Sequence, residues 1–220
     1  MIMYILIPAC LLIAALFIFQ EHKENYVNAV ILKGLASLCF VILGFLTSKG
    51  GTGSLPVITG LILGAAADVL LNLRYVFAEK GKLVFLIGIL VFLSGHIAYL
   101  VAVLPMNPNP LLFIFGGIVL TALIMKWLFT KITAAKAFKI FGIFYIGAIV
   151  ILNCIALGNL ISSYSTFHLI FFAGAFLFLI SDIVLILNTF GSVSKFSLRI
   201  TNLSLYYIGQ ILIALSLLFL

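Results

Sequence analysis

The sequence predicts an all-α membrane protein, a polytopic bundle of about eight transmembrane helices. Apolar residues make up 65% of the 220 positions and charged residues only 8%, whereas a soluble domain is roughly 45–50% apolar and about 25% charged. Eight apolar segments are each long enough to cross a bilayer, which takes about 20 residues. Lipid must therefore be the solvent for most of the surface. Because no polar stretch is long enough to form a soluble domain, we expect residues 1–220 to form one integral membrane domain.

The expected spans follow one another at short intervals, separated by Gly, Pro, Asn and charged residues that are typical of loops. They are 3–19, 28–46, 55–73, 83–104, 110–129, 138–157, 167–188 and 203–220. Open strand edges are excluded in lipid, and these runs are too long and uniform for barrel strands, so each is expected to be a helix. The first run lacks a basic n-region and is too long for a signal-peptide core, so we interpret it as a span.

Lysine and arginine are concentrated on one side of the expected bundle. The first, third, fifth and seventh loops, with the adjoining helix ends, hold Lys23, Lys33, Arg74, Lys80, Lys82, Lys126, Lys131, Lys136, Lys139, Lys195 and Arg199. The opposite side holds only Lys49. Because Lys and Arg accumulate in cytoplasmic loops, this bias places the odd-numbered loops in the cytoplasm and both termini outside, in a bacterial-type inner membrane. The dispersal of these residues also argues against a nucleic-acid partner, despite a net charge of +7.

A weak internal repeat relates the third and seventh expected spans. Both carry an aspartate followed three positions later by leucine, at Asp68 and at Asp182, with Asn72 and Asn188 near the helix ends. Two similar four-helix halves would produce this pattern, and so would chance. Both alternatives stay open from the sequence.

Asp68 and Asp182 are the only acids inside the expected spans. A charged side chain at a helix centre costs roughly 2.5–3.5 kcal/mol on insertion scales, so both are expected to face the bundle interior. Each lies about six residues from the expected cytoplasmic end of its helix, which at 1.5 Å per residue is roughly 9 Å below the boundary. This common depth predicts a shared polar cavity that opens towards the cytoplasmic leaflet.

Other polar residues reach a similar level from the same side. They are Lys33, Asn72, Asn188, Tyr206, Tyr207 and Gln210, of which Tyr206 and Gln210 share a helix face through their i, i+4 spacing. His96 is expected to lie deeper, roughly 20 Å from that side, so its membership of the site stays open. Such side chains also hold helices together in lipid, so a purely structural ion pair between Lys33 and an aspartate is the alternative.

Metal and disulfide chemistry is not indicated by the sequence. The cysteines Cys10, Cys39 and Cys154 lie in apolar runs, and the three histidines are too scattered for the zinc site of a membrane hydrolase. Two buried carboxylates indicate acid–base chemistry instead. Burial and a second negative charge favour the protonated form of a carboxyl group, so one acid could donate a proton while the other activates water.

Five short pieces along the chain match a known family. They are Lys33 early in the second span, Asp68-Val-Leu-Leu, His96-Ile-Ala-Tyr99, Ser181-Asp182-Ile-Val-Leu, and Tyr206-Tyr207-Ile-Gly-Gln210. In their order and spacing the chain resembles the YhhN-like lysoplasmalogenase family, which includes the animal transmembrane lysoplasmalogenases. Ala67 stands where a glycine would be expected and Gly34 where a proline would be, but neither difference removes a reactive group.

The resemblance implies an eight-helix bundle that hydrolyses the vinyl ether bond of lysoplasmalogens, without a metal or other cofactor. Asp68 and Asp182 would be catalytic. The substrate, a lysophospholipid from the cytoplasmic leaflet, would be bound or supported by Lys33, Asn72, His96, Tyr99, Asn188, Tyr206, Tyr207 and Gln210, and its phosphate by Lys33 or Arg74. Two alternatives are a small transporter or proton-coupled carrier that uses the acids as a relay, and a non-catalytic lipid-binding protein of the same fold.

Overall fold

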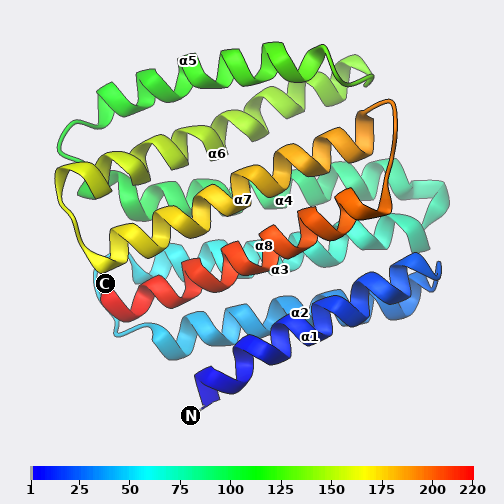
Figure 1. The fold of residues 1–220 in the computed structure, drawn as a ribbon, viewed down its shortest axis with the longest axis horizontal. Helices are drawn as coiled ribbons and strands as arrows, with labels where there is room; N and C mark the ends of the chain where they lie inside the picture. The colour runs from blue at the N-terminus through cyan, green and yellow to red at the C-terminus, as the bar shows by residue number, and fades with distance from the viewer. Residues whose placement is uncertain (1) are drawn as a thin grey trace.

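The chain folds into eight long helices, each apolar and long enough to cross a membrane, as a computed structural model describing residues 2–220 shows (Figure 1). They are α1 (Ile2–His22), α2 (Tyr26–Thr47), α3 (Ser54–Val76), α4 (Gly81–Val103), α5 (Pro110–Phe129), α6 (Lys136–Ser162), α7 (Thr166–Phe190) and α8 (Phe196–Ser216). Three short 3-10 turns complete the helical structure, at Ala78–Lys80, Leu104–Met106 and Leu217–Phe219. The prediction of an all-α polytopic bundle is confirmed.

The surface of the bundle suits a lipid environment. Large apolar side chains such as Ile5, Leu111 and Phe144 project outward, more than half exposed. Charged side chains deep within the spans, in contrast, are turned inward: Lys33, Asp68 and Asp182 are almost completely buried. This inversion of the usual soluble pattern is expected where lipid replaces water, and the protein is an integral membrane protein.

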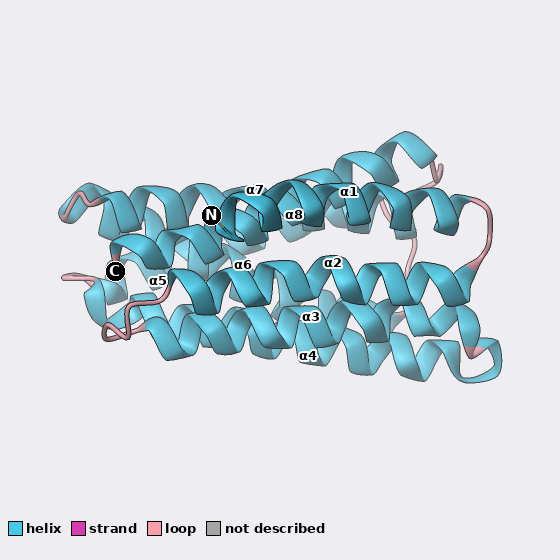
Figure 2. Cartoon of the chain, turned by 90° about the horizontal axis from the view of Figure 1, so that it is seen from below, coloured by secondary structure: helices cyan, strands magenta, loops and turns pink. Residues whose placement is uncertain are grey.

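Consecutive helices run antiparallel, so the connections gather at two ends of the bundle (Figures 1 and 2). The α1–α2, α3–α4, α5–α6 and α7–α8 connections lie together at one end, at the right of Figure 1. Eleven of the twelve Lys and Arg residues lie in or near these connections, and we call this end the basic end. Its assignment to the cytoplasm stays a prediction from the charge bias.

Two close helix crossings fix the position of the acids. In the α3–α4 pair, a Cβ placed on Gly95 would lie 3.3 Å from the carbonyl oxygen of Gly60. In the α7–α8 pair, a Cβ placed on Gly174 would lie 2.7 Å from the carbonyl oxygen of Gly209. Such backbone contact is typical of small residues at helix interfaces in membranes.

The acids occupy matching positions relative to these crossings. Asp68 follows Gly60 by eight residues, and Asp182 follows Gly174 by the same eight residues. The two pairs of helices therefore present their acids at the same distance from their crossing points. This correspondence is what two related four-helix halves would produce.

The eighth helix begins earlier than the sequence predicted. It starts at Phe196 rather than at residue 203, so the polar stretch expected to be a loop forms its first two turns. The reason is that Arg199 and Asn202 find hydrogen-bond partners inside the bundle, on α1 and α7. As a result, Tyr206 and Gln210 lie ten and fourteen residues inside α8 rather than near its start.

Candidate functional site

Asp68 and Asp182 line one cavity inside the half of the bundle nearest the basic end. The cavity contains about 460 Å³ of space, including its open mouth, and its walls come from α2, α3, α4, α6, α7 and α8. Both aspartates are only 2% exposed. Each lies eight residues before the last residue of its helix, so each is about 12 Å from that end at 1.5 Å per residue.

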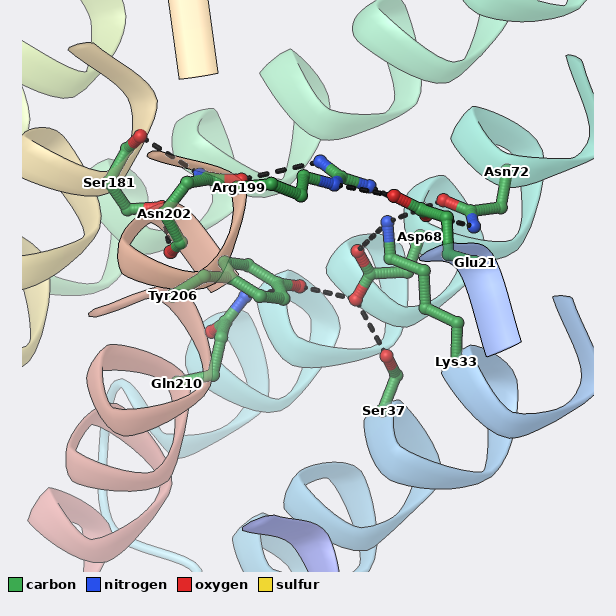
Figure 3. Close-up of polar contacts among 10 residues, drawn as sticks. All are labelled: Glu21, Lys33, Ser37, Asp68, Asn72, Ser181, Arg199, Asn202, Tyr206 and Gln210. Carbon is green, nitrogen blue, oxygen red and sulfur yellow. Dashed lines mark hydrogen bonds and ion pairs between the residues drawn. The ribbon is translucent and has the colours of Figure 1, made fainter. Parts of the chain in front are cut away.

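Asp68 is held by three side chains from α2 and α8 (Figure 3). The ammonium nitrogen of Lys33 lies 3.2 Å from Oδ1. Ser37 and Tyr206 each donate a hydrogen bond of 2.6 Å to Oδ2. Lys33 and Ser37 reach the same carboxylate because their i, i+4 spacing puts them on one face of α2. Asp68 is therefore a fully engaged carboxylate with a cation beside it.

A chain of hydrogen bonds continues from Asp68 towards the centre of the bundle. Gln210 donates to the hydroxyl of Tyr206 at 3.3 Å, and Tyr99 donates to Oε1 of Gln210 at 2.8 Å. The amide of Gln210 packs against Gly64, where a Cβ would approach its nitrogen to 2.9 Å. The chain thus links α4, α8 and α3, and its members have restricted freedom to move.

A second chain runs from Lys33 towards the basic end (Figure 3). Lys33 donates to Oδ1 of Asn72 at 3.1 Å, and Asn72 donates to Oε2 of Glu21 at 2.9 Å. Arg199 donates two hydrogen bonds to the same glutamate, at 2.7 Å to Oε1 and 2.9 Å to Oε2. This network of hydrogen bonds connects α1, α2, α3 and α8 between Asp68 and the basic end.

Asp182 has different partners. Tyr145 donates a hydrogen bond of 2.6 Å to its Oδ2, and Nε2 of His96 lies 3.7 Å from the same oxygen. His96 also lies 3.4 Å from the hydroxyl of Tyr145 and packs edge-on against Phe178. The two acids thus differ: a lysine ammonium group accompanies Asp68, whereas an imidazole and a phenol accompany Asp182.

The structure places His96 beside Asp182, although residue counting from the basic end puts it deeper than the acids. In a helix, each Cα–Cβ bond tilts towards the N-terminus. Since α4 runs away from the basic end, His96 leans towards that end, while Asp182 on the oppositely directed α7 leans inward. The same rule applies to Asp68, whose partners all come from α2 and α8. Both acids therefore lie on helices that run towards the basic end, and the side chains that contact them come from helices that run the other way.

The remaining predicted residues take separate places. Asn188 accepts a hydrogen bond from the backbone N–H of Lys195 at 2.7 Å and so orders the α7–α8 connection rather than joining the acids. Tyr207 is buried against Tyr206 and Phe40, in the packed core beside the side chains that contact Asp68.

Several site residues were not predicted from the sequence. They are Glu21, Ser37, Tyr145, Ser181, Arg199 and Asn202. Asn202 donates to the backbone oxygen and the hydroxyl of Ser181, at 2.9 and 2.7 Å, and so fixes α8 beside Asp182. Ser37 could have been found from its i, i+4 relation to Lys33, but Tyr145 lies in an apolar run that carries no such signal.

A polar mouth leads from the cavity to the basic end. It is lined by Glu21, His22, Asn188, Lys195 and Arg199 among others, and Arg74 borders both this mouth and the cavity. The guanidinium group of Arg74 lies over the rings of Tyr75 and Phe85, at 4.6 and 4.4 Å. Between residues 2 and 220, no carboxylate lies within 4.0 Å of it. Arg74 is therefore a cation at the cavity entrance without an acidic partner in this part of the chain.

Comparison with known proteins identifies the family. A family model described as the YhhN family matches residues 28–217, which is most of the chain. The matched region includes both acids and every partner described above except Glu21. No match was found among curated proteins or among solved structures. Because the match covers most of the chain and includes the surroundings of both acids, the chain belongs to the YhhN family.

Proposed function

We propose that this protein is a membrane hydrolase that cleaves the vinyl ether bond of lysoplasmalogens, with Asp68 and Asp182 as its catalytic residues. The observation that carries the proposal is the pair of buried carboxylates that face one cavity with unlike partners. Acid–base catalysis needs two acids in different surroundings, because one group must donate a proton while the other accepts one. Membership of the YhhN family is consistent with this activity.

The unlike partners suggest a division of roles. Asp182 donates a proton to the β-carbon of the vinyl ether, which leaves an oxocarbenium ion at the carbon bonded to oxygen. Asp68, with the Lys33 ammonium group beside it, stabilises this cation and accepts a proton from the water that adds to it. The resulting hemiacetal then divides: its hydroxyl gives a proton to Asp182, Asp68 gives its proton to the leaving glycerol oxygen, and a fatty aldehyde and a glycerophospho-alcohol are released with both acids restored. His96 lies 3.7 Å from Asp182 and orients this carboxyl group.

The depth of the acids suits a lysolipid. Its sn-1 linkage lies just beneath the headgroup, and the acids lie about 12 Å from the basic ends of their helices. Lys33 already contacts Asp68 and Asn72, whereas Arg74 has no carboxylate partner within the described residues. Arg74 is therefore the cation better placed to receive the phosphate, because guanidinium groups bind phosphate with two parallel hydrogen bonds.

The test is aldehyde release from a defined 1-alkenyl-lysophospholipid by the purified protein in detergent. The matching 1-alkyl and 1-acyl lysolipids serve as controls, because they lack the vinyl ether. We expect aldehyde from the alkenyl lipid alone. If folded protein releases none from any vinyl ether lysolipid, the substrate assignment is wrong. A proton-coupled carrier would instead show flux in sealed vesicles and no chemical product.

A further inference from the structure

A second hollow, which is almost entirely apolar, adjoins the cavity that holds the acids. It contains about 550 Å³ of space between α3, α4, α6 and α7, and its walls include Ile89, Phe141, Gly142 and Ile186. We call it the apolar slot. Pockets for small ligands are lined mainly by apolar and aromatic side chains, as this slot is. The slot is therefore suitable in character to bind a hydrocarbon.

The slot and the cavity of the acids are adjacent. They share five lining residues, which are Leu71, Phe85, Phe92, Tyr145 and Leu185. Among these, Tyr145 donates the 2.6 Å hydrogen bond to Asp182. A chain that lies in the slot would thus begin directly beside the acid that we assign as the proton donor.

The other directions from the cavity do not suit a hydrocarbon. Towards the basic end, the polar mouth carries Glu21, Lys195 and Arg199, and an apolar chain would strip water from these charges. Towards the centre of the bundle, Tyr99 and Phe178 are at most 2% exposed and close the path. The slot is the apolar route that remains.

A cluster of three phenylalanines borders the slot at the basic end. Phe85 of α4, Phe138 of α6 and Phe190 of α7 have ring centroids 5.7–6.5 Å apart. These rings separate the slot from the lysine-containing loops at that end. They also distinguish the slot from the polar mouth, so the cavity has one polar outlet and one apolar outlet.

From this geometry we infer that the apolar slot binds the hydrocarbon chain of a single-chain lipid whose linkage lies between Asp68 and Asp182. The inference rests on the proposed function and specifies where each part of the substrate lies. The chain occupies the slot, the phosphate lies near Arg74 at the polar mouth, and the reacting bond lies where the two hollows meet. One slot accommodates one chain, which accounts for a lysolipid rather than a two-chain lipid as substrate.

The direct test is photolabelling with an uncleavable analogue. A 1-O-alkyl-lysophosphatidylcholine that carries a diazirine near the glycerol end of its chain is irradiated with the whole protein in nanodiscs, and the labelled residues are mapped by mass spectrometry. We expect label on the slot residues of α4, α6 and α7, and competition by unlabelled alkyl lysolipid. Label confined to α1 and α8, or spread over the lipid-facing surface of α5, would overturn the inference.

A matched pair of variants provides the second measurement. Gly142→Leu places a side chain in the slot, and a Cβ there meets no heavy atom closer than 3.9 Å, so the backbone need not move. Gly116→Leu is the control, because nothing lies within 4 Å of a Cβ at that position on α5. We expect Gly142→Leu to reduce slot labelling and analogue binding at least fivefold, with Gly116→Leu unchanged. Equal labelling in both folded variants would contradict the inference.

This readout separates the two proposals. The alkyl analogue is not cleaved, so its binding can be measured independently of hydrolysis. If the slot is labelled but no vinyl ether is hydrolysed, the slot inference stands and the proposed activity is wrong. If vinyl ether is hydrolysed but the slot is not labelled, the activity stands and the slot inference is wrong.

Discussion

Lys33 holds its ammonium nitrogen 3.2 Å from Oδ1 of Asp68, and both side chains are almost completely buried among membrane-spanning helices. A buried ion pair is costly to desolvate, and apolar residues of similar volume often stabilise a protein better. Three further hydrogen bonds, from Ser37 and Tyr206 to the carboxylate and from Lys33 to Asn72, satisfy the remaining polar atoms. An arrangement this costly is more readily explained by chemistry at Asp68 than by stability alone.

Replacement of either acid should stop the reaction. Asp68→Asn and Asp182→Asn preserve side-chain shape but remove the group that accepts or donates the proton, so aldehyde release should fall by about 10²–10⁴-fold. Steady-state assays of the purified variants check this, with size-exclusion profiles as the folding control. Full activity in either variant would refute the two-carboxylate mechanism.

The ion pair can be separated into structural and catalytic parts. Lys33→Met leaves an unpaired carboxylate at Asp68 and should cost about 3–5 kcal/mol of stability. The double variant Lys33→Met/Asp68→Asn should recover part of that loss, because the two changes are coupled. Unfolding midpoints in detergent measure the stability. We expect the double variant to remain inactive; recovery of both stability and activity would show that the pair is only structural.

His96 should affect turnover rather than binding. His96→Asn removes the imidazole beside Asp182, so we expect about 10²-fold slower aldehyde release with little change in KM. The control is His168→Asn at the opposite end of the bundle, where the ring lies beside the carbonyl oxygen of Ser163 and the ring of Phe167. Equal turnover in the two variants would remove His96 from the site.

The helix crossing at Gly174 should be sensitive to a single methyl group. A Cβ there would lie 2.7 Å from the backbone oxygen of Gly209, so Gly174→Ala should force α7 and α8 apart and cost about 1–3 kcal/mol. Activity should fall as well, because Asp182 moves with α7. Gly116→Ala, with no atom within 4 Å of its Cβ, is the matched control and should be neutral or slightly stabilising. Thermal melts of both variants settle the comparison.

Arg74 should govern recognition of the phosphate. Arg74→Gln removes the cation at the cavity entrance, so KM for a lysophospholipid should rise about tenfold while kcat changes little. Lys82→Gln removes the same charge from an exposed position at the basic end and is the control. If a glycerol ether without phosphate loses affinity equally in Arg74→Gln, the assignment of Arg74 to the phosphate is wrong.

The sequence predicted the membrane bundle well because its signals are local. Each span is an apolar run of sufficient length, and Asp68 and Asp182 stand out because acids are expensive inside such runs. Lys33, Tyr206 and Gln210 also contact one another or Asp68, as their common level predicted.

Other residues of the site could not be placed from the sequence, because their contacts depend on helix packing and side-chain direction rather than on spacing along the chain. The sequence predicts loop or helix-end positions for Glu21 and Arg199, because charge normally marks a boundary. In the structure they form an ion pair with each other and lie within α1 and α8. The membership of His96 stays open from the sequence because residue counting ignores the direction in which a side chain leans. Tyr145 is one aromatic residue in an apolar helix, and only the packing of α6 against α7 brings it to Asp182.

The position of the acids eight residues after their crossing glycines has a consequence for their depth in the membrane. A unit of four helices returns the chain to the leaflet from which it started, so a tandem copy is inserted in the same orientation. An acid on the third helix of each copy then lies at the same membrane depth without further change, as Asp68 and Asp182 do. A duplicated unit of three or five helices would have placed the second acid towards the opposite leaflet. Two similar four-helix halves would thus place two carboxylates at one depth in the same leaflet, and different neighbours alone would make their surroundings unequal.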